Sequence, residues 1–146
     1  MKQIVIRGAA AGVIAALTRL CVSWVTHVLG LQPMTVSHVY GLLFLGTQDA
    51  GGLLVGSIGF VLAAPVYGVL LAYLLEFDGY RHWWLKGAGL GAVAWPYTYV
   101  LSRRLYTGPQ LSPTAIAPLS SLAGFVLAGF IASWYLWLAH RYRTKS

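Results

Sequence analysis

The sequence predicts an all-α, polytopic membrane protein with four transmembrane helices and both termini in the cytoplasm. Two properties of its 146 residues lead to this prediction: 58% are hydrophobic and only 9% are charged. A soluble domain typically carries about 25% charged residues, so this chain lacks the polar surface that water requires. Its mean hydropathy of +0.70 agrees with a single transmembrane domain over residues 1–146.

Four apolar runs are long enough to cross a bilayer, which takes about 20 mostly apolar residues per helix. The runs cover residues 4–29, 50–75, 83–101 and 114–139. Arg19 interrupts the first run, and no small-residue cleavage pattern follows it, which argues against a signal peptide. A further apolar stretch over 36–46 is too short to span, so we expect an interfacial or re-entrant helix there.

The basic residues beside these runs predict the orientation. With the N-terminus inside, seven Lys and Arg residues lie on the cytoplasmic side and two lie on the other side. The seven are Lys2, Arg7, Arg81, Lys86, Arg141, Arg143 and Lys145, and the two are Arg103 and Arg104. Cytoplasmic flanks are enriched in Lys and Arg, so we expect a multi-pass protein of the cell membrane, a bacterial inner membrane. The net charge of +7 therefore indicates the lipid bilayer as a partner and not a nucleic acid.

Small residues recur four positions apart in every run. Three runs hold the pairs Gly8–Gly12, Gly52–Gly56 and Gly87–Gly91, and the fourth holds Ser120, Gly124, Ala128 and Ala132. This GxxxG-like spacing lets transmembrane helices approach closely. We therefore expect a tightly packed bundle, formed within one chain or between copies.

Two of the runs begin alike. Residues 7–15 (RGAAAGVIA) and residues 86–94 (KGAGLGAVA) share a cation, a Gly-Ala pair, a second glycine and a later alanine, at an offset of 79 positions. One interpretation is a two-helix hairpin duplicated in parallel, related by an axis along the membrane normal. The other is coincidence, because small residues are common in membrane helices.

Arg19 is the candidate functional residue. A charge in the middle of a span costs about 2.5–3.5 kcal/mol on insertion scales. Arg19, Ser23 and His27 follow one another at four-residue spacing, and Asp49, at the outer end of the second span, is the nearest expected carboxylate. Two interpretations stay open: the arginine snorkels to lipid headgroups or pairs structurally, or it faces the interior and binds an anion.

Reaction groups are sparse in this sequence. The four spans contain no Asp or Glu, and the single cysteine, Cys21, is expected to be buried and inert. His27 and His38 are expected to face each other outside, whereas His82 and His140 lie on the inside. The sequence therefore predicts no catalytic residue, no metal site and no cofactor.

Several motifs resemble those of the YqhR-type membrane proteins of Gram-positive bacteria. They are DAGGLLVG (49–56), VYGVLLAYLL (66–75) and WLKGAGLGAVAW (84–95), and the similarity covers about residues 7–139. The termini of this chain are shorter and less charged than in that family. Since the family is uncharacterised, the resemblance implies a four-helix membrane protein and transfers no catalytic residue.

These observations favour a small, non-enzymatic structural or accessory bundle, either homo-oligomeric or bound to a larger membrane complex. The alternative is a minimal oligomeric transporter or channel for an anionic solute, with Arg19 in its path. A membrane enzyme acting on lipid is disfavoured because no acidic residue lies in a span.

Overall fold

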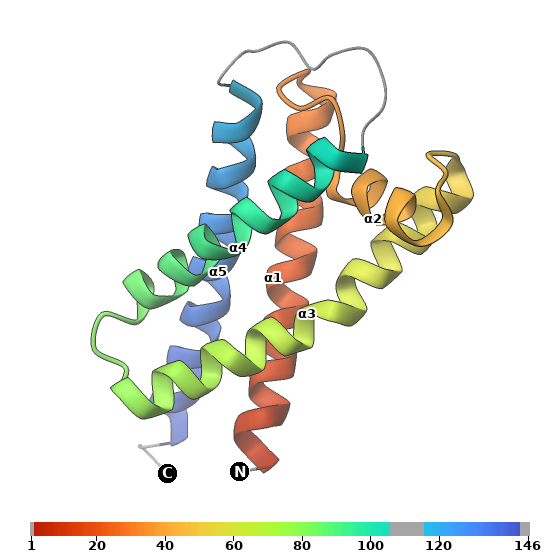
Figure 1. Cartoon of the computed structure of the whole chain (residues 1–146). Coiled ribbons are helices and arrows are strands. Elements are labelled where there is room, and N and C mark those ends of the chain that lie inside the picture. The colour runs from red at the N-terminus through yellow and green to blue at the C-terminus, as the bar shows by residue number, and fades with distance from the viewer. Residues whose placement is uncertain (1, 106–115, 144–146) are drawn as a thin grey trace.

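The regular structure of this protein is helical throughout residues 2–105 and 116–143, the ranges that the computed structural model describes. Five helices follow one another: α1 (Lys2–Val28), α2 (Val36–Leu45), α3 (Ala50–Asp78), α4 (Trp83–Leu105) and α5 (Ile116–Arg143). The four long helices alternate in direction, so α1 begins and α5 ends at the same end of the bundle (Figure 1). The all-α class predicted from the composition is thereby confirmed.

The ends of the helices differ from those of the apolar runs by up to four residues. Hydropathy marks the residues that lipid can surround, whereas a helix ends where its backbone groups find other partners. Thus α3 continues to Asp78, because Gly79 beyond it adopts a positive φ of 75°. The predicted start of the fourth span, at Thr114, lies outside the described residues.

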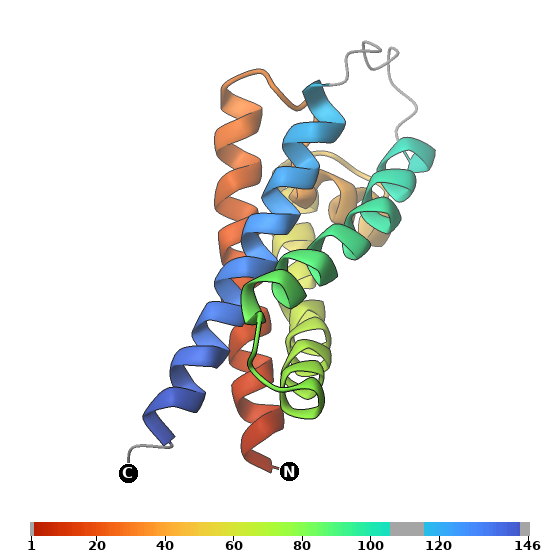
Figure 2. The same cartoon turned by 90° about the vertical axis from the view of Figure 1, so that its left-hand side faces the viewer.

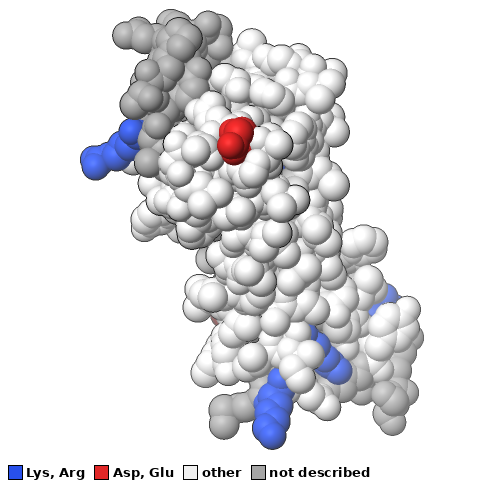
Figure 3. Space-filling view, turned by 90° about the vertical axis from the view of Figure 1, so that its right-hand side faces the viewer, with Lys and Arg blue, Asp and Glu red and all other residues white. Residues whose placement is uncertain are grey.

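Among the described residues, three helices are long and apolar enough to cross a membrane: α1, α3 and, over Ile116–Tyr142, α5. This length and composition indicate a membrane-associated protein. Large apolar side chains such as Ile6, Leu62 and Val93 are exposed on the outside of the bundle. On the face in Figure 3, charged side chains lie only near the two ends, with an uncharged band between them.

Helix α1 is the centre of the bundle, because it packs against both α3 and α5; Figure 2 shows α5 in front of it. Against α3 the contact is backbone on backbone. A Cβ added to Gly12 would meet the carbonyl oxygen of Ala64, and one added to Gly68 would meet the carbonyl oxygen of Gly8. The glycines therefore let the two helices touch without intervening side chains.

The other predicted small residues lie at similar crossings. In α4, a Cβ on Gly87 would meet Gly129 and Ser133 of α5, and one on Gly91 would meet the Phe125 carbonyl. In α3, Gly56 lies against α2, and Gly52 lies against Thr47. On α5, Ala128 and Ala132 are buried in the core, with Ala11, Ala15 and Leu71 among their neighbours, and Gly124 faces the guanidinium of Arg19.

A short helix forms in the long connection, over Val36–Leu45, where the apolar stretch predicted one. Its N-cap is Thr35, whose hydroxyl accepts from the His38 backbone N–H, while His38 Nδ1 accepts from the Thr35 backbone N–H. Gly46, with a φ of 68°, ends the helix. Helix α2 then packs against α3, where the Ser37 and Ser57 hydroxyls lie 2.7 Å apart.

Candidate functional site

Arg19 lies inside the bundle. Its side chain is 2% exposed, on the face of α1 that is buried against the other helices. Nη2 donates a 3.0 Å hydrogen bond to the Ser121 hydroxyl of α5, and the guanidinium carbon lies 4.6 Å from the centre of the Phe125 ring. The structure excludes the snorkelling interpretation, whereas structural pairing and anion binding are both compatible with this position.

The guanidinium keeps unused hydrogen-bonding capacity. Its Nε and Nη1 are buried and have no hydrogen-bond partner among the described residues. Buried polar groups in folded proteins are almost always hydrogen-bonded, and a charged group without partners is especially costly. The unused donors of Arg19 are therefore the feature of this bundle that most needs an explanation.

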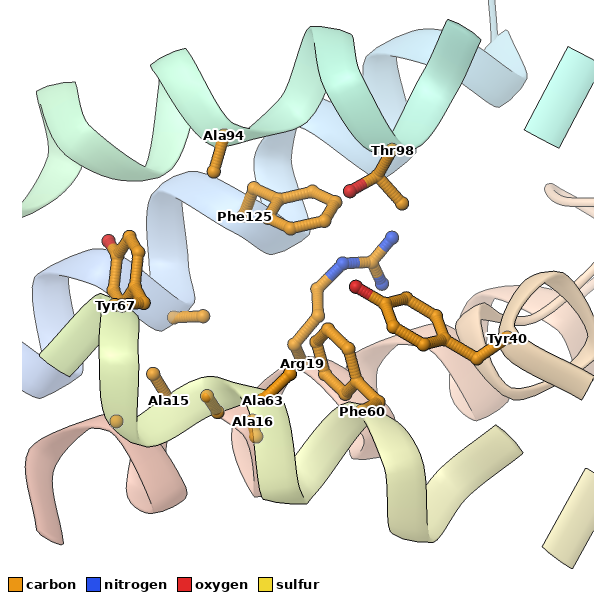
Figure 4. Close-up of a pocket in the computed structure, with 13 residues that line it drawn as sticks. Ala15, Ala16, Arg19, Tyr40, Phe60, Ala63, Tyr67, Ala94, Thr98 and Phe125 are labelled. Atoms are coloured by element: carbon orange, nitrogen blue, oxygen red, sulfur yellow. The ribbon is translucent and has the colours of Figure 1, made fainter. Parts of the chain in front are cut away.

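A pocket of about 160 Å³ adjoins this side chain, and all five helices contribute to its wall. Its lining combines Arg19 with small and aromatic side chains (Figure 4). The lining residues are Gly12, Ala15, Ala16, Arg19, Tyr40, Phe60, Ala63, Ala64, Tyr67, Ala94, Thr98, Phe125 and Ala128. The pocket is thus an apolar chamber with one cationic group.

Hydroxyl groups lie at two places in this chamber. In Figure 4 the Tyr40 and Thr98 side chains point toward the guanidinium, whereas Tyr67 lies at the far end, beyond the alanines. The Tyr67 hydroxyl is buried and has no hydrogen-bond partner among the described residues. Polar groups therefore lie at both ends of an apolar middle section.

Ser23 and His27 serve a different part of the molecule from Arg19. The Ser23 hydroxyl, fully buried, accepts a 3.0 Å hydrogen bond from the backbone N–H of Val36, the first residue of α2. His27 Nδ1 lies 2.9 Å from the Gln32 carbonyl oxygen, and its ring centre lies 5.6 Å from that of His38. The contacts of Ser23 and His27 hold the connection between α1 and α2 against the end of α1. The short distance between the two rings confirms that His27 and His38 face each other.

Asp49 does not pair with Arg19. It is the N-cap of α3, where its Oδ1 accepts from the Gly52 backbone N–H at 2.7 Å and from the Thr47 hydroxyl at 3.0 Å. These two hydrogen bonds hold the pKa of the exposed Asp49 carboxyl below its usual value. A carboxylate fits this position because the first N–H groups of a helix lack intrahelical acceptors.

Cys21 also differs from its prediction, because it is exposed and not buried. Two residues after Arg19, it lies about 200° further round α1, away from the buried face. Among the described residues, no three His, Cys, Asp or Glu side chains gather as they would around a metal ion.

Sequence reasoning missed the residues that surround the Arg19 guanidinium. Tyr40 comes from the short helix α2, Thr98 from α4, and Ser121 from α5. Neither spacing nor composition distinguishes these three from other tyrosines and hydroxyl residues of the chain. Local signals existed for four other pocket residues: Gly12 and Ala128 belong to the small-residue series, and Ala15 and Ala94 are the equivalent alanines that close the two similar segments.

Comparison with known proteins adds no family to this picture. No protein-family model, no curated protein and no solved structure matches the chain. A function must therefore be argued from the geometry of the bundle and its pocket.

Proposed function

We propose that this chain crosses the cell membrane four times, with α1, α3, α4 and α5 as the spans and both termini in the cytoplasm. Helix α4 is the least apolar of the four, but its 23 residues extend about 34 Å, enough for a hydrocarbon core about 30 Å thick. The alternating helix directions and the seven-to-two distribution of basic residues support this topology. The resemblance to YqhR-type proteins supports this proposal in one respect, because it implies a four-helix membrane protein.

Labelling of single cysteines in intact cells tests the topology. In a Cys21→Ala background, Thr47→Cys is expected to react with a membrane-impermeant maleimide from outside, and Lys2→Cys only after the cells are opened. Labelling of Lys2→Cys in intact cells would refute the orientation. Equal protection of both positions would refute an outward-facing connection between α2 and α3.

We further propose that the protein is a non-enzymatic membrane bundle that binds an anion at Arg19. One observation carries this proposal: a buried guanidinium with unpartnered Nε and Nη1 adjoins a pocket walled by five helices. An arginine retained only for helix packing would be expected to direct its donors to carbonyl or hydroxyl groups. An anion in the pocket would neutralise the charge and satisfy these donors.

The arrangement of the same residues favours binding over catalysis. The pocket lining consists of one arginine, three tyrosine or threonine side chains, two phenylalanines and small residues. An arginine stays protonated and holds an anion in place, but it does not exchange protons readily. Homo-oligomerisation, or a role as an accessory subunit in a membrane complex, is compatible with this binding and remains part of the proposal.

A second candidate is transport of the bound anion. It is favoured by Pro65 and Pro96, which lie inside α3 and α4 within two positions of the pocket residues Ala64 and Ala94. A proline inside a helix removes a backbone donor and allows a bend. Bends of α3 and α4 at these two prolines would let the pocket open toward either side of the membrane.

Binding and flux measurements on the purified protein test both candidates. Sodium salts of several anions are added during thermal unfolding in detergent, with Arg19→Gln as the variant and Arg81→Gln, an exposed cation, as its control. Stabilisation by an anion in the wild type and Arg81→Gln, but not in Arg19→Gln, is the expected result. No anion-dependent difference between the two variants would refute the proposed binding, and Arg19-dependent flux into proteoliposomes would establish transport.

A further inference from the structure

The charge of the pocket limits the charge of its ligand. Arg19 is the one cationic side chain among the described residues that line it. A monoanion would neutralise that charge, whereas a dianion such as sulfate would leave a net negative charge among apolar walls. Because uncompensated charge is costly in such surroundings, the pocket matches a singly charged ligand.

The guanidinium also limits the shape of the ligand's charged group. Phe125 lies against the guanidinium, and Ser121 takes one of the two Nη2 hydrogens. One Nη2 hydrogen lies parallel to Nε–H and the other lies parallel to an Nη1–H, and neither Nε nor Nη1 has a partner. Whichever Nη2 hydrogen Ser121 takes, one pair of parallel donors therefore stays free. Two parallel donors in one plane match the two oxygens of a carboxylate.

The size and lining of the pocket describe the rest of the ligand. Next to Arg19 the wall is formed by alanines and by the rings of Phe60 and Phe125 (Figure 4). Its volume of about 160 Å³ is close to that of engineered protein cavities of about 150 Å³ that bind benzene. The chamber therefore has room for a small hydrocarbon body next to Arg19.

We propose that the ligand of this pocket is a small monocarboxylate with an apolar body about the size of a benzene ring. The carboxylate accepts two hydrogen bonds from the free edge of Arg19, and the hydroxyls of Tyr40 and Thr98 lie beside it. The body fills the alanine-lined section toward Tyr67. This inference rests on the proposed function, since it names the chemical class of the anion bound at Arg19.

Binding measured by calorimetry on the purified full-length protein at neutral pH tests this proposal. Sodium benzoate is the probe, sodium acetate supplies the charged group without the body, and benzamide supplies the body without the charge. Benzoate is expected to bind at least about tenfold more tightly than acetate, because it buries an additional apolar ring. Benzamide and sodium sulfate are expected to show no binding over the same concentration range.

Two pairs of variants separate the charged end from the apolar body. Arg19→Lys keeps the charge but loses the planar pair of donors, so benzoate affinity should fall about tenfold or more, while Arg81→Lys should not change it. Ala94→Leu fills the chamber without touching Arg19, so it should weaken benzoate and leave acetate unchanged. Ala123→Leu, at an exposed position on α5, is its control.

The outcomes distinguish this inference from the proposed function on which it rests. Arg19-dependent binding in which benzoate is no tighter than acetate, or in which sulfate competes, would overturn the monocarboxylate and retain an anion site. Equal benzoate binding to the wild type and Ala94→Leu would overturn it as well. If no anion binds in an Arg19-dependent way, both proposals fail.

Discussion

The hydroxyl of Ser23 accepts a hydrogen bond from the backbone N–H of Val36, and this contact joins the C-terminal third of α1 to the first turn of α2. One turn before it on the same helix, Arg19 contacts α5 and the pocket. Along α1, the part that holds the connection to α2 and the part that lines the pocket therefore meet between these two residues.

Removing the Ser23 hydroxyl should loosen this connection. In Ser23→Ala the buried N–H of Val36 loses its acceptor, which costs about 1–3 kcal/mol. Equilibrium unfolding in detergent measures the loss, and Thr18→Ala, whose hydroxyl donates only to Ile14 within α1, is the control. Benzoate affinity should be the same in both variants; a loss of binding without a loss of stability would place Ser23 in the ligand site.

A methyl group at Gly68 should separate α1 from α3. In Gly68→Ala the new Cβ would meet the carbonyl oxygen of Gly8 and the backbone of Gly12, and overpacking of this kind costs about 1–3 kcal/mol. Gly89→Ala is the matched control, because nothing lies within 4 Å of its Cβ position. The control should keep or gain up to about 1 kcal/mol, and equal stability of the two variants would contradict backbone contact at this crossing.

The stability of α2 should depend on pH through His38. Burial, and then the neighbouring His27, lower the pKa of His38 below its ordinary value. Around and below that ordinary value, about 6.5, the unfolded segment binds more protons than the folded one, so stability is present above it and is lost as the pH falls. Protonation of Nδ1 would also remove the acceptor for the Thr35 backbone N–H.

Hydrogen exchange of the α2 amides at about pH 7.5 and about pH 5.5 measures this effect. After correction for the intrinsic slowing of amide exchange in acid, a smaller protection factor is expected at the lower pH. His38→Gln should abolish the difference, because glutamine can occupy this capping position without titrating in this range. A pH dependence that persists in His38→Gln would assign it to His27 or to another group.

Replacing Arg19 by methionine should raise the unfolding temperature while it abolishes anion binding. Methionine fills a similar volume without the cost of a charge inside a span, about 2.5–3.5 kcal/mol on insertion scales. Thermal unfolding of Arg19→Met without added ligand measures the change. A clear drop in the unfolding temperature would instead show that the Ser121 hydrogen bond and the Phe125 contact stabilise the bundle.

The local properties of the chain were predictable from the sequence. Apolar runs marked the long helices to within a few residues, and the short stretch after residue 35 became α2, because lipid-facing backbone must form its own hydrogen bonds. The polar stripe Arg19, Ser23 and His27 lay on one helix face as the spacing required. These side chains nevertheless contact different helices, because α1 crosses different helices along its length: Arg19 bonds to α5 and Ser23 bonds to α2.

Sequence alone determined that the chain is helical, that it carries too little charge to be solvated by water, and that Arg19 is an unusual residue. Only the tertiary structure decided which groups surround that guanidinium. Periodicity and hydropathy depend on residues close together in the chain, whereas the surroundings of Arg19 depend on which helices cross at its height. Tyr40 lies 21 positions from Arg19 and Ser121 lies 102 positions away, and only the packing of small residues brings them together.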